Sequence, residues 1–377
     1  MRILLFAAAL CATLSLTAQQ RGGFYLSGDT RAAYTDLTDN PERLAYWVSN
    51  PLRRPTGLLA QSYRSGYFLT KRLLLGSRVG YVRGERDYHY SYSDGAVLVQ
   101  PFVRYYFLGT EASELSLFGE LGFGTIGIGD ADGFETDFHL GLGAERGVAA
   151  GVLATANLNY NANASGTNLT DLTIGLNVLT GQLATATSDA PLAAGTLSLD
   201  GRLGTVAYGR NGNSSQRTVM ASVDLAPRVG YFVRDGLLVE ADLAFSYGKE
   251  EMTGSNAFWV YDLHDASLDL GVAARYYPLR SGRLLPYAGA GVSYLRSSER
   301  FSFGDGQYQN MAYRAAPVAL TLGADFFLAP QVALDVAARY RSGSINYPAG
   351  GQIAHNKLRE LQVMAGLRFF FGPAGTN

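Results

Sequence analysis

Apolar and polar residues alternate with a period of two along most of the chain. In residues 331–341 (QVALDVAARYR) valine and leucine occupy one face, and Asp335 and Arg339 lie on the opposite face. Residues 237–247 and 360–370 alternate in the same way. Because successive side chains of a β-strand point to opposite sides, the pattern predicts strands of roughly ten residues with one apolar and one polar face.

Short and long connections alternate between the predicted strands. The short turns fall at 69–72, 109–114, 146–149, 234–236, 280–283 and 328–331. The longer polar connections fall near 38–55, 83–95, 130–134, 161–168, 209–216, 248–264, 296–312 and 341–356. Outer-membrane barrels have this asymmetry, with tight periplasmic turns and longer outer loops.

The strand pattern occurs twice along the chain. The sequence RYYFLG at 104–109 returns as RYYPLR at 275–280, and further stretches on either side also align. We therefore predict a first eight-stranded repeat at 22–181, a polar linker at 182–195 and a second eight-stranded repeat at 196–372.

The first eighteen residues have the features of a secretory signal peptide. Arg2 supplies the positive end, Ile3 to Leu10 form the apolar stretch, and small residues lead to Ala18. We expect cleavage after Ala18. The only cysteine, Cys11, lies within this segment, so the exported chain is expected to have no disulfide.

Composition limits the possible classes of protein. Of the 377 residues 47% are hydrophobic, and the net charge of −1 provides no basic field for nucleic acid. After the signal peptide no apolar run approaches the ~20 residues that a membrane helix needs. An exported chain of alternating strands can still span a membrane as a closed β-barrel, because closure satisfies every backbone polar group.

The chain resembles the bacterial outer-membrane β-barrel protein family, with its OmpA-like and OmpX-like eight-stranded domains. The resemblance is carried by the strand end PFVRYYF at 101–107, its copy at 275–278 and the aromatic closing strand at 361–371. It implies an all-β fold, a transmembrane antiparallel up-and-down barrel of about sixteen strands. A last strand followed by GPAGTN departs from the terminal aromatic residue that is usual in such proteins.

Two eight-stranded barrels and one sixteen-stranded ring both remain possible, because either arrangement leaves no open sheet edge. The linker is longer than the other inner turns, and this length favours two barrels. Small residues on the inner faces, such as Gly271, Ala273 and Ala333, suit a narrow interior that is filled by side chains.

Charged residues on the inner faces are the first group of candidate site residues. Arg275 and Glu240 lie at matching distances from the inner ends of neighbouring strands, and Arg104 and Glu120 can meet across the 109–114 turn. Buried charges need partners, so we expect a network of ion pairs in the interior. Its predicted members are Arg104, Glu120, Glu240, Asp242, Arg275, Asp335, Arg339, Glu360 and Arg368. This network either plugs the barrel or gates an ion pore.

Aromatic residues gather at the turn-side ends of the strands. Aromatic rings with a polar edge prefer the boundary between membrane and water, so these clusters indicate a periplasmic aromatic girdle. Its predicted members are Tyr67, Tyr105, Tyr231, Tyr276, Phe326, Phe369 and Phe371.

Other motifs give weaker signals, and none indicates a cofactor, a metal or a catalytic residue. The glycines of GFGTIG at 122–127 lack the helix of a dinucleotide-binding loop. The acidic cluster at 129–137 has the wrong glycine spacing for a calcium loop. His89 and His264 occupy matching outer loops, a position used by outer-membrane enzymes, but surface histidines explain them better.

Three functions fit these observations. We favour a non-enzymatic protein of the cell outer membrane with a structural or surface-interaction role. A passive porin for ions or small solutes is the alternative, and a lipid-modifying enzyme is a third. The expected partners are outer-membrane lipid and lipopolysaccharide, together with the barrel-assembly machinery during biogenesis; no nucleic acid is expected, and the surface ligand is unknown.

Overall fold

The fold is an antiparallel β-barrel in the computed structural model of the chain. The structure describes residues 23–27, 29–37, 63–88, 90–109, 115–128, 134–149, 151–163, 168–179, 192–200, 202–212, 216–254, 260–302, 308–349 and 352–372. These residues form twenty strand segments. None of them belongs to a helix long and apolar enough to cross a membrane. The predicted signal peptide, the 38–55 connection, His89 and most of the predicted linker lie outside the described residues.

The strand segments divide between the two repeats. The first repeat contains β1 (Phe24–Ser27), β2 (Asp29–Leu37), β3 (Tyr63–Phe68), β4 (Leu73–Tyr88), β5 (Tyr90–Leu108), β6 (Leu115–Ile128), β7 (Phe134–Ala149), β8 (Val152–Asn163) and β9 (Asn168–Leu179). The second contains β10 (Leu197–Asp200), β11 (Arg202–Gly212), β12 (Gln216–Leu225), β13 (Arg228–Arg234), β14 (Leu237–Gly254), β15 (Val260–Tyr276), β16 (Leu284–Ser302), β17 (Tyr308–Ala315), β18 (Val318–Ala329), β19 (Val332–Ala349) and β20 (Gln352–Phe371).

Four pairs of consecutive segments are single strands with a short interruption. One residue separates β1 from β2 and β10 from β11, and two residues separate β12 from β13 and β17 from β18. The longer interruptions contain Pro227 and Pro317, which have no N–H to donate to a ladder. Counting each interrupted pair once reduces the twenty segments to sixteen strands, the predicted number.

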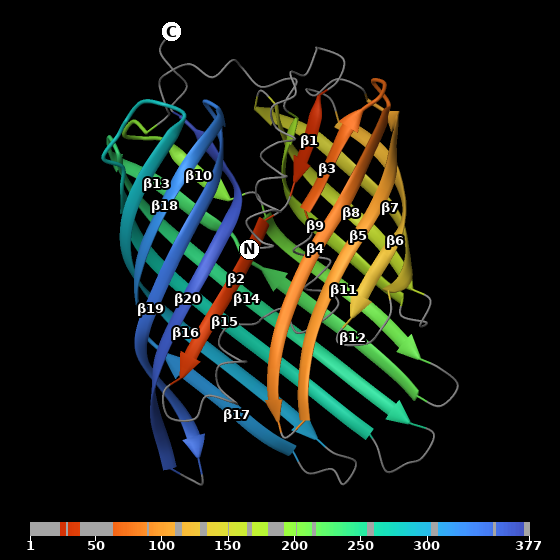
Figure 1. The fold of residues 1–377 in the computed structure, drawn as a ribbon, viewed down its shortest axis with the longest axis vertical. Helices are drawn as coiled ribbons and strands as arrows, with labels where there is room; N and C mark the ends of the chain where they lie inside the picture. Colours follow the sequence, from red (N-terminus) through yellow and green to blue (C-terminus); the bar gives the residue numbers. More distant parts are fainter. Residues whose placement is uncertain are drawn as a thin grey trace.

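At the end with the short turns, hereafter the turn end, the sixteen strands form two separate eight-stranded rings (Figure 1). The first ring contains β1 and β3 to β9, and it closes where Tyr25 and Leu26 of β1 pair with Leu179 and Val178 of β9. The second ring contains β10, β13 to β16 and β18 to β20, and it closes where β10 pairs with β20. The prediction of two eight-stranded units is confirmed at this level.

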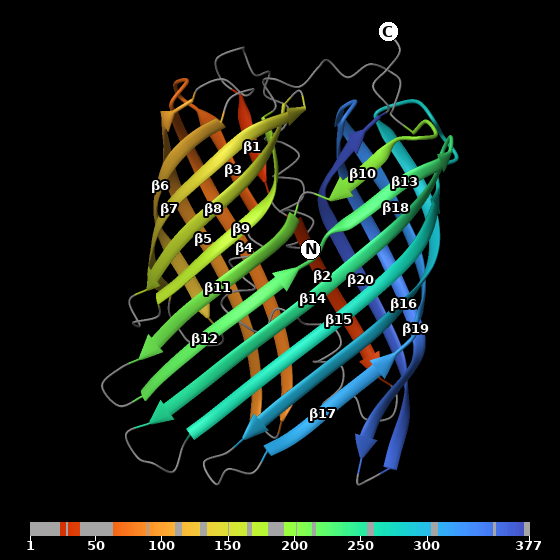
Figure 2. The ribbon, with the colours of Figure 1, turned by 180° about the vertical axis from the view of Figure 1, so that it is seen from behind.

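At the opposite end, hereafter the loop end, the two repeats are joined by hydrogen-bonded ladders. There β9 pairs with β11, with Leu172 opposite Val206, and β20 pairs with β2, with Ala365 opposite Thr30. Figure 2 shows β11, β12 and β14 spanning the lower half between the two cylinders. The first strand of each repeat therefore begins in its own ring and continues along the last strand of the other repeat.

The interior of each ring is packed, and the alternation of the sequence follows that packing. Along β13 the side chains are alternately buried and exposed from Arg228 to Tyr231. The second ring has an apolar core that includes Phe232, Tyr277 and Phe370, and the first has one around Phe102 and Phe118. A further apolar cluster from β8, β9, β19 and β20 lies between the two rings.

The loop-end strands are longer than the sequence predicted. Residues 83–95 and 248–264 were expected to be polar connections, but β4, β5, β14 and β15 continue through most of them. The ladder between β14 and β15 extends to Thr253 opposite Val260. Outside the hydrocarbon layer both faces of a strand can be polar, so the alternation of apolar and polar residues that reveals a strand is lost there.

Glycines close the tight turns at the other end. Gly151 precedes β8 with φ 70°, and Gly236 precedes β14 with φ 71°. Positive φ is costly for a residue with a Cβ atom, so glycine suits these positions. The turns keep neighbouring strands in the register that brings inner-face charges together.

Candidate functional site

The candidate site is the pair of charged networks that fill the two rings at the turn end. Both are built from inner-face side chains of neighbouring strands, and the strand ladders set which charges meet. In the first ring Arg104 of β5 is opposite Glu120 of β6. In the second ring Arg275 of β15 and Glu240 of β14 lie on adjacent strands, two residues out of register.

Arg104 is the centre of the first network and is fully buried. Its Nε donates to Glu120 Oε2 at 2.8 Å, and its Nη1 donates to Glu145 Oε1 at 2.7 Å. The guanidinium carbon also lies 3.9 Å from the centre of the Phe118 ring. Two carboxylates and an aromatic face therefore surround one arginine, a geometry that fixes its position.

A polar layer on the loop side continues the first network. His139 Nε2 lies 2.9 Å from Glu120 Oε1, and His139 Nδ1 lies 2.9 Å from Asn161 Oδ1. Asn159 and Asn161 donate to Asp171 at 2.6 and 3.2 Å. All five side chains are buried, so this layer of the first ring consists of polar groups that hydrogen-bond to one another.

The second network joins two arginines and two carboxylates. Arg275 forms ion pairs with Glu240 and with Asp335, the latter at 3.3 Å. Arg368 Nη2 lies 2.9 Å from Asp335 Oδ2 and 3.1 Å from Glu240 Oε1. Tyr287 donates to Asp335 at 2.5 Å. The four charges compensate one another within the ring.

Further ion pairs follow the interior of the second repeat away from this network. Arg339 lies 3.5 Å from Asp242, and Arg341 pairs with Asp269 and with Glu360, the latter at 2.5 Å. Every charged residue named from the sequence for the interior therefore contacts an opposite charge.

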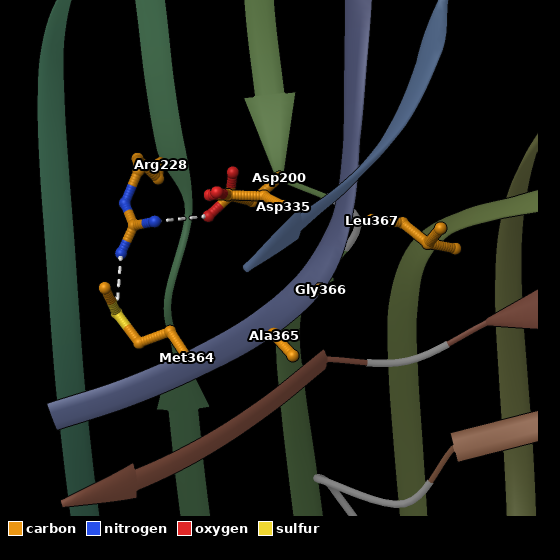
Figure 3. Close-up of a pocket in the computed structure, with 7 residues that line it drawn as sticks. All are labelled: Asp200, Arg228, Asp335, Met364, Ala365, Gly366 and Leu367. Carbon is orange, nitrogen blue, oxygen red and sulfur yellow. Dashed lines mark hydrogen bonds and ion pairs between the residues drawn. The ribbon is translucent and has the colours of Figure 1, made fainter. Parts of the chain in front are cut away.

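A small cavity lies beside the second network, where β20 leaves β10 for β2. Its volume is about 10 Å³, room for roughly one water molecule. Arg228 contacts Asp200 at 3.1 Å and the Met364 sulfur at 3.7 Å along its edge (Figure 3). Since a water-sized space beside an ion pair is too small for a solute, this cavity gives no passage through the ring.

Several members of the networks were not named from the sequence. Glu145, Arg64 and Tyr25 contribute to the first network, Asp200 extends the second at Arg368, and Arg341 belongs to the ion pairs beyond it. Alternating asparagines in residues 157–161 (NLNYN) were the available signal for a polar inner face on β8. Arg341 lies on the same face as Asp335 and Arg339, so the alternation was its signal. The other four required the register between strands distant in sequence.

The predicted girdle aromatics separate into two groups. Five of them point outward and are exposed: Tyr67, Tyr105, Tyr231, Tyr276 and Phe326. Phe369 is instead fully buried among Val152, Val178 and Val332, and Phe371 is partly buried against the same cluster. Where the rings meet, β8 and β9 of the first repeat cover the outer faces of β19 and β20 of the second. Phe369 therefore packs against protein and not against lipid.

The histidines that the structure describes at the loop end have polar neighbours. His264 Nδ1 lies 3.3 Å from the Tyr247 hydroxyl, and His355 Nδ1 lies 2.6 Å from Asn346 Oδ1. Among the described residues no group of three His, Cys, Asp or Glu side chains could hold a metal ion.

Comparisons with known proteins identify the fold family. No curated protein matches the chain. Among solved structures, OprG of Pseudomonas aeruginosa is 17% identical, with 49% of this chain and all of OprG covered and a TM-score of 0.30. The outer membrane protein AlkL, solved in lipid bilayers, is 15% identical, with 52% of this chain and 98% of AlkL covered and a TM-score of 0.27.

A bacterial polysaccharide outer membrane secretin is 10% identical, with 94% of this chain and all of the secretin covered and a TM-score of 0.40. The family profile of the outer membrane protein beta-barrel domain matches residues 178–369, just over half of the chain. The sixteen antiparallel strands, the outward apolar face and this match lead to one conclusion: the chain belongs to the outer membrane β-barrel family and is an outer-membrane protein.

Proposed function

We propose that the protein is a non-conducting, non-enzymatic scaffold of the outer membrane, and that its joined loop end is a surface for interactions outside the cell. The observation that carries the proposal is the filled interior of both rings. Arg104 and Arg368, at the centres of the two networks, are 0% and 1% exposed. A solute that crosses either ring would have to displace paired buried charges, which costs several kcal/mol per unpaired charge.

Each ring is also too narrow to leave a channel beside the side chains that point into it. An eight-stranded barrel has an interior that side chains just fill. In the first ring Phe102, Phe118 and Tyr106 occupy that space, and in the second Phe232, Phe370 and Tyr287 do. Aromatic packing and ion pairing therefore both support a plugged barrel.

Single-channel recording in planar lipid bilayers tests the proposal. We expect no stepwise current from the purified protein, and none from Arg275→Ala, because Arg368, Tyr277 and Tyr287 still fill the second ring. A general porin inserted in the same bilayer provides the positive control. Stepwise currents from the unaltered protein, changed in size by Arg275→Ala, would instead establish an ion pore whose gate is the second network.

A passive porin is the second candidate, and the loop-end joining favours it. There the ladders join both repeats into one continuous sheet that runs from β3 through β9 and β11 to β20 and β2. General porins, with about sixteen strands, enclose an aqueous channel. Such a wide entrance would still lead to two filled rings, so we place the porin second. A lipid-modifying enzyme is the third candidate, and it would need a nucleophile beside a histidine such as His264.

Export and partners complete the proposal. We infer that residues 1–18 are removed as a signal peptide, and N-terminal sequencing of the outer-membrane protein should begin at residue 19. A first residue of Met1 would contradict cleavage.

The proposed partners are outer-membrane lipid, including lipopolysaccharide, and the barrel-assembly machinery that folds the strands. No nucleic acid or cofactor is part of the proposal.

A further inference from the structure

Four outward-facing polar side chains form one continuous row across the loop end of the second repeat. Arg296 of β16 is opposite Arg314 of β17, Arg314 is opposite Asn346 of β19, and Asn346 is opposite His355 of β20. All four side chains are exposed. Direct partners in an antiparallel ladder point to the same side of the sheet, so the four groups share one surface.

The row lies on the outer face of the barrel. Its chain neighbours point inward and are buried: Leu295, Ser297, Tyr313, Ala315 and Ile345. Further along the same strands, toward the turn end, the outward residues are apolar and exposed: Tyr294, Val318, Leu320, Tyr340 and Leu361. The row therefore adjoins the lipid-facing band, at the level where lipid headgroups begin.

Two positive charges, Arg296 and Arg314, stand side by side in this row. Like charges directly opposite each other in a ladder are destabilising. Within the described part of the chain neither Arg296 nor Arg314 forms an ion pair, whereas Lys249 on the outer face of β14 is paired with Glu251. Exposed Lys357 and Arg359 follow His355 on β20 and increase the positive charge. An external anion would remove the repulsion.

We propose that this row binds the phosphate groups of an anionic lipid in the outer leaflet. Guanidinium groups match phosphate in geometry and bind it with charge-assisted hydrogen bonds. The hydrogen bond from His355 Nδ1 to the Asn346 oxygen, 2.6 Å long, leaves the Asn346 amide nitrogen as a further donor. The adjoining apolar residues would contact the acyl chains, and this favours a lipid over a soluble phosphate or a protein partner.

The inference rests on the proposed function only for orientation, since it requires the loop end to face outward. The binding site itself can be tested in micelles, independently of orientation and conductance. The full chain would be folded in a neutral detergent, and the probes would be lipid A with two phosphates and the same lipid after dephosphorylation. Native mass spectrometry would give the dissociation constant of each lipid.

The test uses a double variant that combines Arg296→Glu and Arg314→Glu. A second double variant, at the turn end, is the matched control. Arg234 and Arg283 are also exposed, so Arg234→Glu with Arg283→Glu changes the net charge equally. We expect lipid A to bind at least about tenfold more weakly to the first variant, since two charge-assisted contacts are lost, and within about twofold of normal to the control. Inorganic phosphate should not displace the lipid.

Each result decides between the possibilities. Equal binding of the dephosphorylated lipid, or unchanged binding by the Arg296/Arg314 variant, would overturn the proposal, and displacement by inorganic phosphate would show a site for free anions instead. Heat-modifiable gel mobility would show that the variants fold. If the glutamate double variant does not fold, Arg296→Gln with Arg314→Gln removes the same charges and takes its place.

Labelling of Asn310→Cys on intact cells by an impermeant maleimide tests the orientation of the loop end separately. Failure of the labelling would overturn the proposed outward loop end and leave the binding result standing.

Discussion

At the scale of single residues, the most constrained side chains are the buried arginines of the two rings. Arg104 has both Glu120 and Glu145 within 2.8 Å and is closed off by aromatic rings. Arg146, three residues before the end of β7, is exposed at the turn end. These two arginines of the first repeat allow buried and exposed charge to be compared directly.

We predict that Arg104→Ala destabilises the barrel by about 3–5 kcal/mol, because two buried carboxylates lose their main partner. Urea unfolding of the protein in lipid vesicles, followed by tryptophan fluorescence, would measure the free energy of unfolding. Arg146→Ala is the control, and it should change that free energy by less than about 0.5 kcal/mol. Equal effects of the two substitutions would show that the network adds nothing to stability.

The sequence revealed part of this network, and the limit has a physical reason. Arg104 and Glu120 flank one short turn, so their meeting follows from counting residues along a hairpin. The contact between Arg104 and Glu145 requires closure of the ring, which no hairpin count provides. The same applies to Tyr25, whose hydroxyl reaches Glu145 over 120 positions in sequence.

At the scale of strands, the narrow rings depend on glycines placed opposite large rings. Gly76 of β4 is the ladder partner of Phe102 of β5, and both face the interior. A Cβ atom at Gly76 would lie 2.5 Å from the Phe102 ring and 2.6 Å from the Ser65 carbonyl oxygen. Gly119 of β6 faces outward, and a Cβ atom there would meet nothing within 4 Å.

We predict that Gly76→Ala destabilises the first ring by about 1–3 kcal/mol, since either the Phe102 ring or the backbone must shift. Gly119→Ala should stay within about 0.5 kcal/mol of the unaltered protein, because it adds a methyl group on the lipid side. Midpoints of urea unfolding in the same vesicles would compare them. A Gly119→Ala effect as large as that of Gly76→Ala would show that strand glycines matter for backbone freedom and not for packing.

Strand positions in the membrane could be predicted from the sequence, whereas strand ends could not. Between Val318 and Leu322 the apolar residues point to lipid and set a clear alternation. Beyond the membrane the outer face of β19 and β20 becomes polar, yet their ladder continues to Ala349 opposite Gln352. The polar composition that indicated loops at 341–356 is equally compatible with a solvated hairpin.

At the scale of the whole molecule, the two repeats exchange their first strands at the loop end. The segments β1 and β10 each complete their own ring, and their continuations β2 and β11 pair with the last strand of the other repeat. In the sequence one glycine separates the segments in both places, Gly28 and Gly201. The sequence alone offered two rings or one, because periodicity does not show which edges pair.

We predict that cysteines at Leu172 and Val206 form a disulfide within one chain upon oxidation. These residues are ladder partners on β9 and β11, and both are exposed on the outer face. Partners in an antiparallel ladder have Cα atoms about 4.5–5.5 Å apart, within the range that a disulfide spans. Because Cys11 is the only native cysteine and lies in the predicted signal peptide, no other thiol should compete.

The matched control pairs Leu172→Cys with Val229→Cys. Val229 is equally exposed but belongs to β13, whose partners are β10 and β14. Mass spectrometry after proteolysis would identify the 172–206 cross-link and should find none between 172 and 229. If the 172–206 pair stays reduced while the protein keeps its heat-modifiable folded form, the repeats are two independent barrels along their whole length, and the loop end cannot act as one continuous surface.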